Sequence, residues 1–439
     1  MKKNRLFWFG LISTAVFWLA GCGPTPTPKP DVYEPSSQYT LLDEVSLFPT
    51  PNVPTATSPP TPLPTKIPAT PQPKPTVSVQ ELQKIYPEEP LPGSDVEVIA
   101  SDLAEPVTLV FAPDGRLFFT EKVTGNIRVI VNGELLPEPV LGLEVGSHSE
   151  QGLLGLAVDP DFESNHYMWA TYTVPARANN DQKVNRMIRF TEENNKAVDV
   201  VTVLETPNNE GDGIHNMNNL SFGPDGMLYV TVGEDNIPSN AQNLSEPRGK
   251  ILRFKPTVPL SAPEDNPFYD GDGPNFDGIY AYGFRNSFDF VIDPLSDDMT
   301  IFATENGPSC DDEVNLVLRG NNYGWNSQHD CDNENGYHPE LNSIPPMWYT
   351  NQTISPTGIT VYTGDDFYEW YGDVFFCSYN DGMFHHLTLN ETRDSFTTHR
   401  SINGISCQTD VITAPDGSLY FLEGGGYVPG TIKRLYRKR

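Results

Sequence analysis

Basic residues are scarce in this sequence. It has 28 lysines and arginines against 58 aspartates and glutamates, which gives a formal net charge of -30. Nucleic acids and anionic lipid surfaces are bound through clustered lysines and arginines, so this balance argues against both kinds of partner. An acidic surface is compatible with calcium binding, although most carboxylates of such a chain simply face solvent.

Long apolar runs are missing after the first 20 residues, so no later segment is expected to cross a membrane as a helix. The single apolar run, from Leu6 to Ala20, follows the basic residues Lys2, Lys3 and Arg5. At about 15 residues it is shorter than the roughly 20 that a membrane-spanning helix needs. A charged segment followed by a short apolar one is typical of an export signal.

The end of the apolar run, Leu19-Ala20-Gly21-Cys22, resembles the bacterial lipobox. The resemblance implies a signal peptide at residues 1–21 and a lipid on Cys22. We therefore expect an exported protein, anchored to the outer face of the cell membrane or held as a periplasmic or outer-membrane lipoprotein. An ordinary signal peptide with an incidental cysteine is the alternative.

Apolar residues are also few in the segment after Cys22, which is dominated by proline, threonine and serine. Too little apolar surface is present there to offset the conformational entropy that folding removes. We expect residues 22–94 to form a disordered, proline-rich linker of extended character. The folded domain is then expected at residues 95–439.

Cysteine is rare, with five in the whole chain. Without Cys22, an even set of four remains, which suits disulfides in an oxidising compartment. Three pairings are possible, and we favour Cys310–Cys331 and Cys377–Cys407 because each closes a short span of chain. A zinc site is less expected, because no Cys-x-x-Cys spacing occurs.

Helical periodicity is almost absent from residues 95–439, where one phrase recurs instead. A β-rich run leads into a Pro-Asp or Pro-Asp-Gly turn, and a second β-rich run follows, which predicts a hairpin. Clear instances have their turns at 111–115, 158–162, 222–226, 291–294 and 413–417, and a less regular one lies at 362–365. Six hairpins at spacings of about 45 to 70 residues predict an all-β, six-bladed β-propeller. A β-helix and a pair of sandwiches are the alternatives.

The two ends of this domain are expected to meet. Residues 96–99 and residues 431–435 both have strand character, and pairing them would close the ring. Closure removes an exposed sheet edge, which is otherwise a site of aggregation.

An ordered set of motifs resembles the glucose/sorbosone dehydrogenase family, whose members include soluble aldose dehydrogenases that use pyrroloquinoline quinone (PQQ). The motifs cover nearly the whole domain. They are Glu150-Gln151-Gly152-Leu153-Leu154-Gly155-Leu156-Ala157, His215-Asn216, Gly283-Phe284-Arg285-Asn286, Glu305-Asn306-Gly307-Pro308, Asp311-Asp312-Glu313 and Tyr323-Gly324-Trp325.

The resemblance assigns roles to five residues. His215 matches the general base, which takes the proton of a sugar C1 hydroxyl while hydride leaves C1 for the quinone. Arg285 and Asn286 match the pair that meets PQQ, and a guanidinium suits its carboxylates through bidentate, charge-assisted bonds. Glu150 and Gln242 are approximate matches to polar positions that line the pocket.

Calcium is also implied. By resemblance, the backbone carbonyls of Gly307 and Pro308 hold the calcium ion that touches PQQ. Glu313 and Tyr323 match ligands of a further, structural calcium. The neighbouring acidic residues offer the hard oxygen ligands that Ca²⁺ prefers.

The sequence departs from the family pattern at three places. Met217-Asn218-Asn219 follows the histidine where the family commonly has two glycines and a polar or basic residue. Residues 378–381 and 406–409 hold no lysine or arginine, whereas family members place cations near PQQ in both regions. PQQ carries three carboxylates, and burying them beside one arginine is costly without other donors.

The resemblance implies PQQ- and calcium-dependent oxidation of an aldose sugar at C1 to a lactone, with electrons passed to an acceptor that the sequence does not identify. The alternative is a non-catalytic, calcium-stabilised cell-surface propeller that binds a carbohydrate or a protein. A calcium-dependent lactonase is a third interpretation, but it does not explain the order of the motifs.

Overall fold

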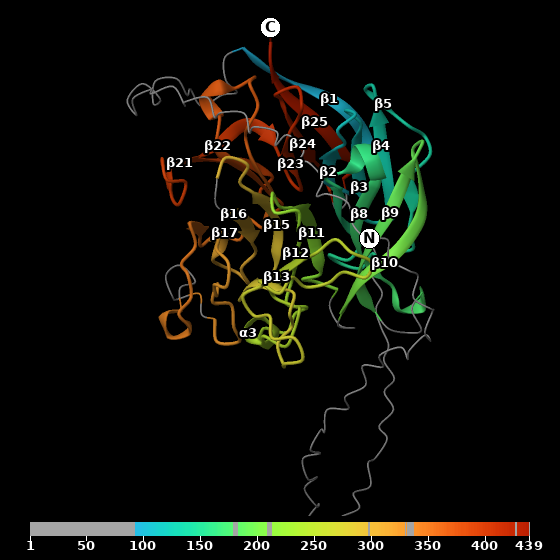
Figure 1. Ribbon diagram of the computed structural model, residues 1–439. Coiled ribbons are helices and arrows are strands. Elements are labelled where there is room, and N and C mark those ends of the chain that lie inside the picture. Colours follow the sequence, from blue (N-terminus) through green and yellow to red (C-terminus); the bar gives the residue numbers. More distant parts are fainter. Residues whose placement is uncertain are drawn as a thin grey trace, which may run out of the picture. The chain divides into compact units, whose positions relative to one another are not determined.

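The structure is a computed structural model (Figure 1), and it describes the following residues: 93–178, 183–208, 213–296, 299–329, 331, 338–425 and 428–438. The predicted signal peptide, the lipid site at Cys22 and nearly all of the predicted linker lie outside the described residues. No helix among the described residues is long and apolar enough to cross a membrane.

The described chain forms a six-bladed β-propeller, as the hairpin repeat predicts. The first three blades follow one another in sequence. Blade 1 holds β2 (Pro106–Phe111), β3 (Leu117–Glu121) and β4 (Asn126–Val131), with β5 (Glu134–Leu135) and β6 (Leu141–Gly142) on β4. Blade 2 holds β7 (Leu153–Val158), β8 (Tyr167–Val174), β9 (Val184–Glu193) and β10 (Lys196–Pro207). Blade 3 holds β11 (Met217–Phe222), β12 (Leu228–Val232), β13 (Lys250–Phe254) and β14 (Ile279–Tyr282).

The remaining blades repeat the same antiparallel order. Blade 4 holds β15 (Ser287–Ile292), β16 (Ile301–Glu305), β17 (Asp312–Val317) and β18 (Trp348–Thr350). Blade 5 holds β19 (Pro356–Val361), β20 (Val374–Ser378), β21 (Met383–Leu389) and β22 (Phe396–Ser406). Blade 6 holds β23 (Val411–Thr413), β24 (Leu419–Glu423), β25 (Gly430–Arg437) and β1 (Ser94–Leu103). Short helices are α2 (Phe162–Asn165), α3 (Ser239–Gln242) and 3-10 turns at Ala176–Ala178, Pro339–Leu341 and Tyr368–Trp370.

The Pro-Asp-Gly turns join the first and second strands of their blades. In the turn between β2 and β3, the Gly115 amide donates to the Ala112 carbonyl at 2.9 Å. Gly115 has a φ of 86°, which a residue with a side chain adopts only under strain. The Asp114 carboxylate accepts the Arg116 amide at 3.1 Å. Aspartate and glycine therefore specify this turn locally, which is why the sequence reveals it.

The ring is closed by the two ends of the domain, as predicted. Strand β1 pairs antiparallel with β25, with Val96 opposite Leu435 and Val98 opposite Lys433. Figure 1 shows β1, in blue, beside β25, in red. Residues from both ends of the chain thus complete blade 6.

Apolar side chains fill the spaces between neighbouring blades rather than one central core. Phe118 of blade 1 packs in one cluster with Leu153 and Met168 of blade 2. The equivalent cluster between blades 6 and 1 contains Leu422 and Phe119. Six such clusters, one at each junction of the described blades, hold the ring together by burial of apolar surface.

Hydrogen bonds also cross from blade to blade around the axis. The Leu109 amide of β2 donates to the buried Asp410 carboxylate beside β23 at 2.6 Å. The Ile359 amide of β19 donates to Asp289 of β15 at 2.9 Å. Threonine hydroxyls add further links, from Thr108 to the Leu154 carbonyl at 2.5 Å, Thr304 to Thr357 at 2.7 Å and Thr409 to Pro106 at 2.9 Å.

Two disulfides join the pairs that the spacing favours. Cys310 is bonded to Cys331 with a Cα–Cα distance of 5.8 Å, and Cys377 to Cys407 with a Cα–Cα distance of 4.9 Å. The first bridges the loop before β17 to a later loop of blade 4. The second ties β20 to the chain that follows β22, within blade 5.

Asp289 offers a direct test of the bonds between blades. It accepts the Ile359 amide and, at 2.5 Å, the Asn219 side-chain amide. Asp289→Ala leaves the buried Ile359 N–H without its partner, so we expect a loss of roughly 1–3 kcal/mol in the free energy of unfolding. Urea denaturation measures this loss. The exposed Asp272→Ala is the matched control, with a change within about 0.5 kcal/mol. Equal stability of the two variants would contradict the proposed contribution.

Candidate active site

A cavity of about 470 Å³ opens where the innermost strands of the blades begin. All six blades contribute to its wall, each through a residue in or just before its innermost strand. These residues are Val107, Leu154, His215, Phe288, Thr357 and Thr409. The volume lies in the range typical of small-molecule sites.

Most of the residues predicted for the site meet in this cavity. Its wall includes six of them: Glu150, His215, Arg285, Asn286, Gly307 and Pro308. Gln242 is not part of this wall in the described structure, because its side-chain amide donates to Asn322 at 2.9 Å and to the Trp325 carbonyl at 2.8 Å. Glu313 and Tyr323 line a second, smaller cavity instead.

His215 is held in an uncommon backbone conformation with a φ of 55°. The chain after β12 passes close to it, since a Cβ on Gly233 would lie 2.5 Å from the His215 carbonyl carbon. The His215 amide donates to Glu150 Oε2 at 2.8 Å. The ring Nδ1 lies 2.7 Å from Glu234 Oε1, and both side chains are buried. A carboxylate at Nδ1 places the proton there and leaves the lone pair on Nε2.

Arg285 and Asn286 are fixed through their backbone by one carboxyl group. Glu305 Oε1 accepts both backbone amides at 2.7 Å. The Arg285 guanidinium donates to the carbonyls of Asn306 at 2.9 Å and Gly307 at 3.0 Å. Burial lowers the pKa of Arg285 from its usual value.

Glu150 connects three blades at the cavity wall. It lies just before β7 of blade 2, and its Oε2 accepts the His215 amide of blade 3. The same oxygen accepts the Asn286 side-chain amide of blade 4 at 3.3 Å. A single carboxylate therefore sets the spacing between the histidine and the Arg285–Asn286 pair.

The second cavity, of about 20 Å³, is acidic. Its wall has three carboxyl groups and two basic side chains, together with Gly307 and Pro308. The carboxyl groups belong to Glu305, Asp311 and Glu313, and the basic side chains are Arg285 and His329. Burial raises the pKa of Glu305 to about 8, and it also raises the pKa values of Asp311 and Glu313. Glu305 Oε2 and Asp311 Oδ1 have no hydrogen-bond partner among the described residues.

These carboxyl groups fit a divalent cation. Oxygen atoms that are buried without a donor are stabilised by a hard cation such as Ca²⁺. Glu313 faces the same space, although it also accepts the Asn315 side-chain amide at 2.9 Å. The Tyr323 phenol bonds the Leu316 carbonyl and the Leu318 amide, each at 2.8 Å. Tyr323 could therefore offer a cation only its backbone carbonyl.

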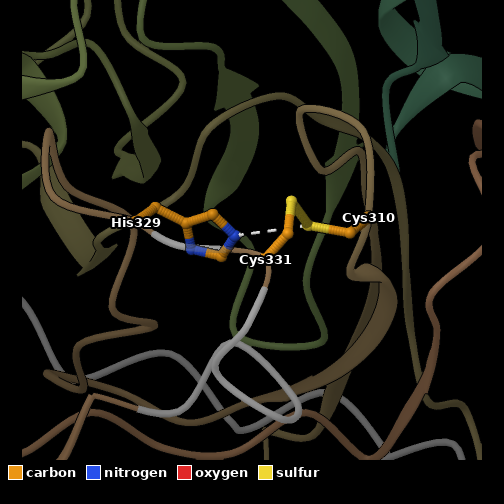
Figure 2. Close-up of side chains that lie close together, drawn as sticks. All are labelled: Cys310, His329 and Cys331. Atoms are coloured by element: carbon orange, nitrogen blue, oxygen red, sulfur yellow. Dashed lines mark hydrogen bonds between the residues drawn. A yellow bond between two sulfur atoms is a disulfide. The ribbon is translucent and has the colours of Figure 1, made fainter.

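A group of three potential metal ligands lies beside the acidic cavity, where Figure 2 shows His329 next to Cys310 and Cys331. The disulfide occupies both sulfur atoms, so no thiolate is present to bind zinc. His329 Nε2 lies 3.2 Å from Asp311 Oδ2 instead. The cluster is thus a disulfide with a histidine–aspartate pair at its side.

The larger cavity also suits an anionic, planar cofactor such as PQQ. Two basic side chains, Lys122 and Arg285, belong to its described wall. At the positions where the family pattern leads us to expect further cations, the wall has Asn380 and Thr409. His215 lines the same cavity, so a base and two cations share one wall. The Gly307 carbonyl, which is predicted to hold calcium, accepts the Arg285 guanidinium at 3.0 Å.

Sequence reasoning missed Glu234 and Lys122, and it gave no role to Glu305 although this residue begins one of the family motifs. The two glutamates follow a pattern that is visible in the sequence, since a glutamate ends or closely follows the second strand of four blades. These glutamates are Glu121, Glu234, Glu305 and Glu423. Lys122 comes directly after the first of them.

Comparisons with known proteins agree with this site. A sequence model of the glucose/sorbosone dehydrogenase family matches residues 103–429. The aldose sugar dehydrogenase of Escherichia coli is 29% identical over 341 residues, which cover 75% of this chain and 89% of that protein. Quinoprotein glucose dehydrogenase B of Acinetobacter calcoaceticus is 30% identical over 276 residues, covering 55% of this chain and 54% of that one.

Solved structures show the same fold. The crystal structure of a glucose dehydrogenase-type oxidoreductase from Thermus thermophilus superposes with a TM-score of 0.67 at 28% identity. The match covers 78% of this chain and 100% of that structure. These relatives support the oxidation of a sugar as the general reaction. The chain belongs to the glucose/sorbosone dehydrogenase family.

Proposed function

We propose that this protein oxidises aldose sugars at C1 to lactones, using PQQ as the electron acceptor and calcium as a bound ion. The observation that carries the proposal is the convergence of the buried His215–Glu234 pair and Arg285 on one cavity. The oxidation removes a proton and a hydride from the sugar. The base accepts the proton, and the cation binds the anionic cofactor that accepts the hydride.

His215 acts as the general base in this proposal. Because Nδ1 is bonded to Glu234, Nε2 is the nitrogen that accepts the proton of the C1 hydroxyl. Glu234 then stabilises the imidazolium ion that forms. PQQ, when bound, supplies the acceptor for the hydride and its two electrons. Loss of the proton and the hydride leaves a carbonyl at C1, which in a cyclic aldose is a lactone.

Arg285 and Asn286 orient the cofactor. Glu305 holds both backbone amides, so the backbone that carries the two side chains is fixed to β16. A guanidinium forms charge-assisted bonds with carboxylates. The Asn286 amide links this pair to Glu150 and through it to the histidine.

Calcium is proposed at the acidic cavity beside Gly307 and Pro308. The unpartnered oxygens of Glu305 and Asp311 and the carboxyl group of Glu313 support it. A divalent cation there would neutralise buried carboxylates and stabilise the loop at Gly307 and Pro308, which also lines the larger cavity.

The central test is reconstitution of the full chain with PQQ and CaCl₂, followed by dye reduction with a panel of aldoses. We expect turnover in the native protein and a fall in kcat of at least about 100-fold in His215→Asn, because general-base catalysis contributes that much or more. Asparagine tolerates the positive φ of this position. The Kd for PQQ is expected to stay within about threefold of the native value.

The matched control is His166→Asn, because His166 is exposed and has a φ of 54°. It should leave kcat unchanged. Turnover retained in His215→Asn would refute the assignment of the base. No PQQ binding at micromolar concentrations would favour the other candidate, a non-catalytic propeller that binds a carbohydrate or protein. That candidate is supported by blades 5 and 6, which contribute no lysine or arginine to the described wall of the cavity.

Calcium binding is tested separately by thermal unfolding. A ligand at 100 times its Kd stabilises the folded state by about 2.7 kcal/mol, so CaCl₂ should raise the Tm of the native protein in a concentration-dependent way. Glu313→Gln removes one carboxylate from the cavity and should abolish most of this shift. Glu340→Gln, at a side chain that is 65% exposed, should keep the full shift. Identical shifts in both variants would contradict a calcium site at Glu313.

A further inference from the structure

The wall of the larger cavity contains an ion pair that the proposed reaction does not use. Lys122 follows β3 and Glu105 precedes β2, so both belong to blade 1. The Lys122 Nζ lies 2.8 Å from Glu105 Oε2. The two side chains are 18% and 20% exposed, and both line the cavity that holds His215 and Arg285.

The position of Lys122 is fixed by the neighbouring blade. Its carbonyl accepts the Leu153 amide of β7 at 3.1 Å. Gly152 packs against it so closely that a Cβ there would lie 2.3 Å from Lys122 Cγ and 2.6 Å from the Lys122 carbonyl oxygen. The glycine in the Glu150-Gln151-Gly152 motif thus makes room for the lysine stem at the cavity wall.

The balance of charged side chains in the cavity wall indicates a role for Lys122 in binding an anion. The described wall has two cations, Lys122 and Arg285, and two carboxylates, Glu105 and Glu150. The Arg285 guanidinium already donates to two backbone carbonyls. A cofactor with three carboxylates needs more than this one cation if it is to be desolvated.

We propose that Lys122 is a second carboxylate-binding residue of the cofactor site, and that Glu105 is the counter-ion that holds it in place before the cofactor binds. The inference rests on the proposed function, since the ligand it names is PQQ. An ammonium group has three donors, so Lys122 can bond a cofactor carboxylate while it keeps its contact with Glu105. In this chain, blade 1 would supply to the cavity wall a positive charge that blades 5 and 6 do not supply.

The opposing interpretation is a purely structural ion pair. In that case Lys122→Met would still weaken PQQ binding, because the unpaired Glu105 would repel the carboxylates of the cofactor. The double variant Glu105→Gln/Lys122→Met separates the two interpretations. It removes both charges, so the net charge of the wall stays as in the native protein. No unpaired Glu105 is left to repel the cofactor, and any remaining loss of affinity comes from the missing Lys122 ammonium group.

The experiment measures the Kd of PQQ for the full chain in saturating CaCl₂ without sugar, by quenching of tryptophan fluorescence. We expect Lys122→Met to bind PQQ roughly tenfold more weakly or worse, which is the effect of losing one charge-assisted bond. The double variant should remain several-fold weaker than the native protein. Lys122→Arg should recover affinity to within about threefold, and Glu105→Gln alone should bind at least as tightly as the native protein.

Lys433→Met is the matched control, because Lys433 is 24% exposed and pairs with Glu423 at the end of β24, outside the described wall of the cavity. It should leave the Kd unchanged even if the Tm falls. A double variant with native affinity would overturn the role of Lys122 and leave a structural pair. Failure of the native protein itself to bind PQQ would instead refute the proposed function, and the inference with it.

Discussion

Convergence of six innermost strands on one axis is the constraint on which the rest of this structure depends. The strands are held there by bonds between blades that are far apart in sequence, as when the Leu109 amide of blade 1 reaches the Asp410 carboxylate beside blade 6. Pairing of β1 with β25 joins the two ends of the domain within blade 6 and so closes the ring. Because the strands begin around a common cavity, each blade contributes to its wall, and residues such as Glu150, His215 and Arg285 become neighbours.

Electrostatics inside the ring differ from those of the acidic protein as a whole. The cavity wall balances two cations against two carboxylates, and Glu234 gives the histidine a buried partner. Buried carboxyl groups gather at one place, where Glu305 and Asp311 each keep an oxygen without a donor. Such an arrangement is costly without a compensating charge, and the calcium ion is proposed there for that reason. The proposed sites of the cofactor and the calcium ion and the proposed base thus lie within one set of side chains that contact one another.

Much of the fold is predictable from the sequence because its signals are local. An Asp-Gly pair such as Asp114-Gly115 specifies its turn through one side-chain bond and one positive φ, so each of the three Pro-Asp-Gly hairpins can be recognised by itself. Ring closure follows from strand character at the two ends. Residues of the site can be predicted from the sequence only where they belong to one of the family motifs. Glu234 and Lys122 cannot be assigned from the sequence because each meets its partner only when two strands of its blade pair, with His215 lying 19 residues before Glu234 and Glu105 lying 17 residues before Lys122. The predicted place of Gln242 at the pocket is likewise decided by a distant contact, since its amide is bonded to Asn322.

The most direct measurement is a single turnover without added dye. The protein loaded with one equivalent of PQQ and with calcium is mixed anaerobically with glucose, and the absorption of the bound cofactor is followed. The account predicts reduction of one equivalent of PQQ per chain, slowed by a primary isotope effect when the sugar carries deuterium at C1, because the hydrogen at C1 leaves as hydride. Bound PQQ that no aldose reduces, or reduction that deuterium at C1 does not slow, would contradict it.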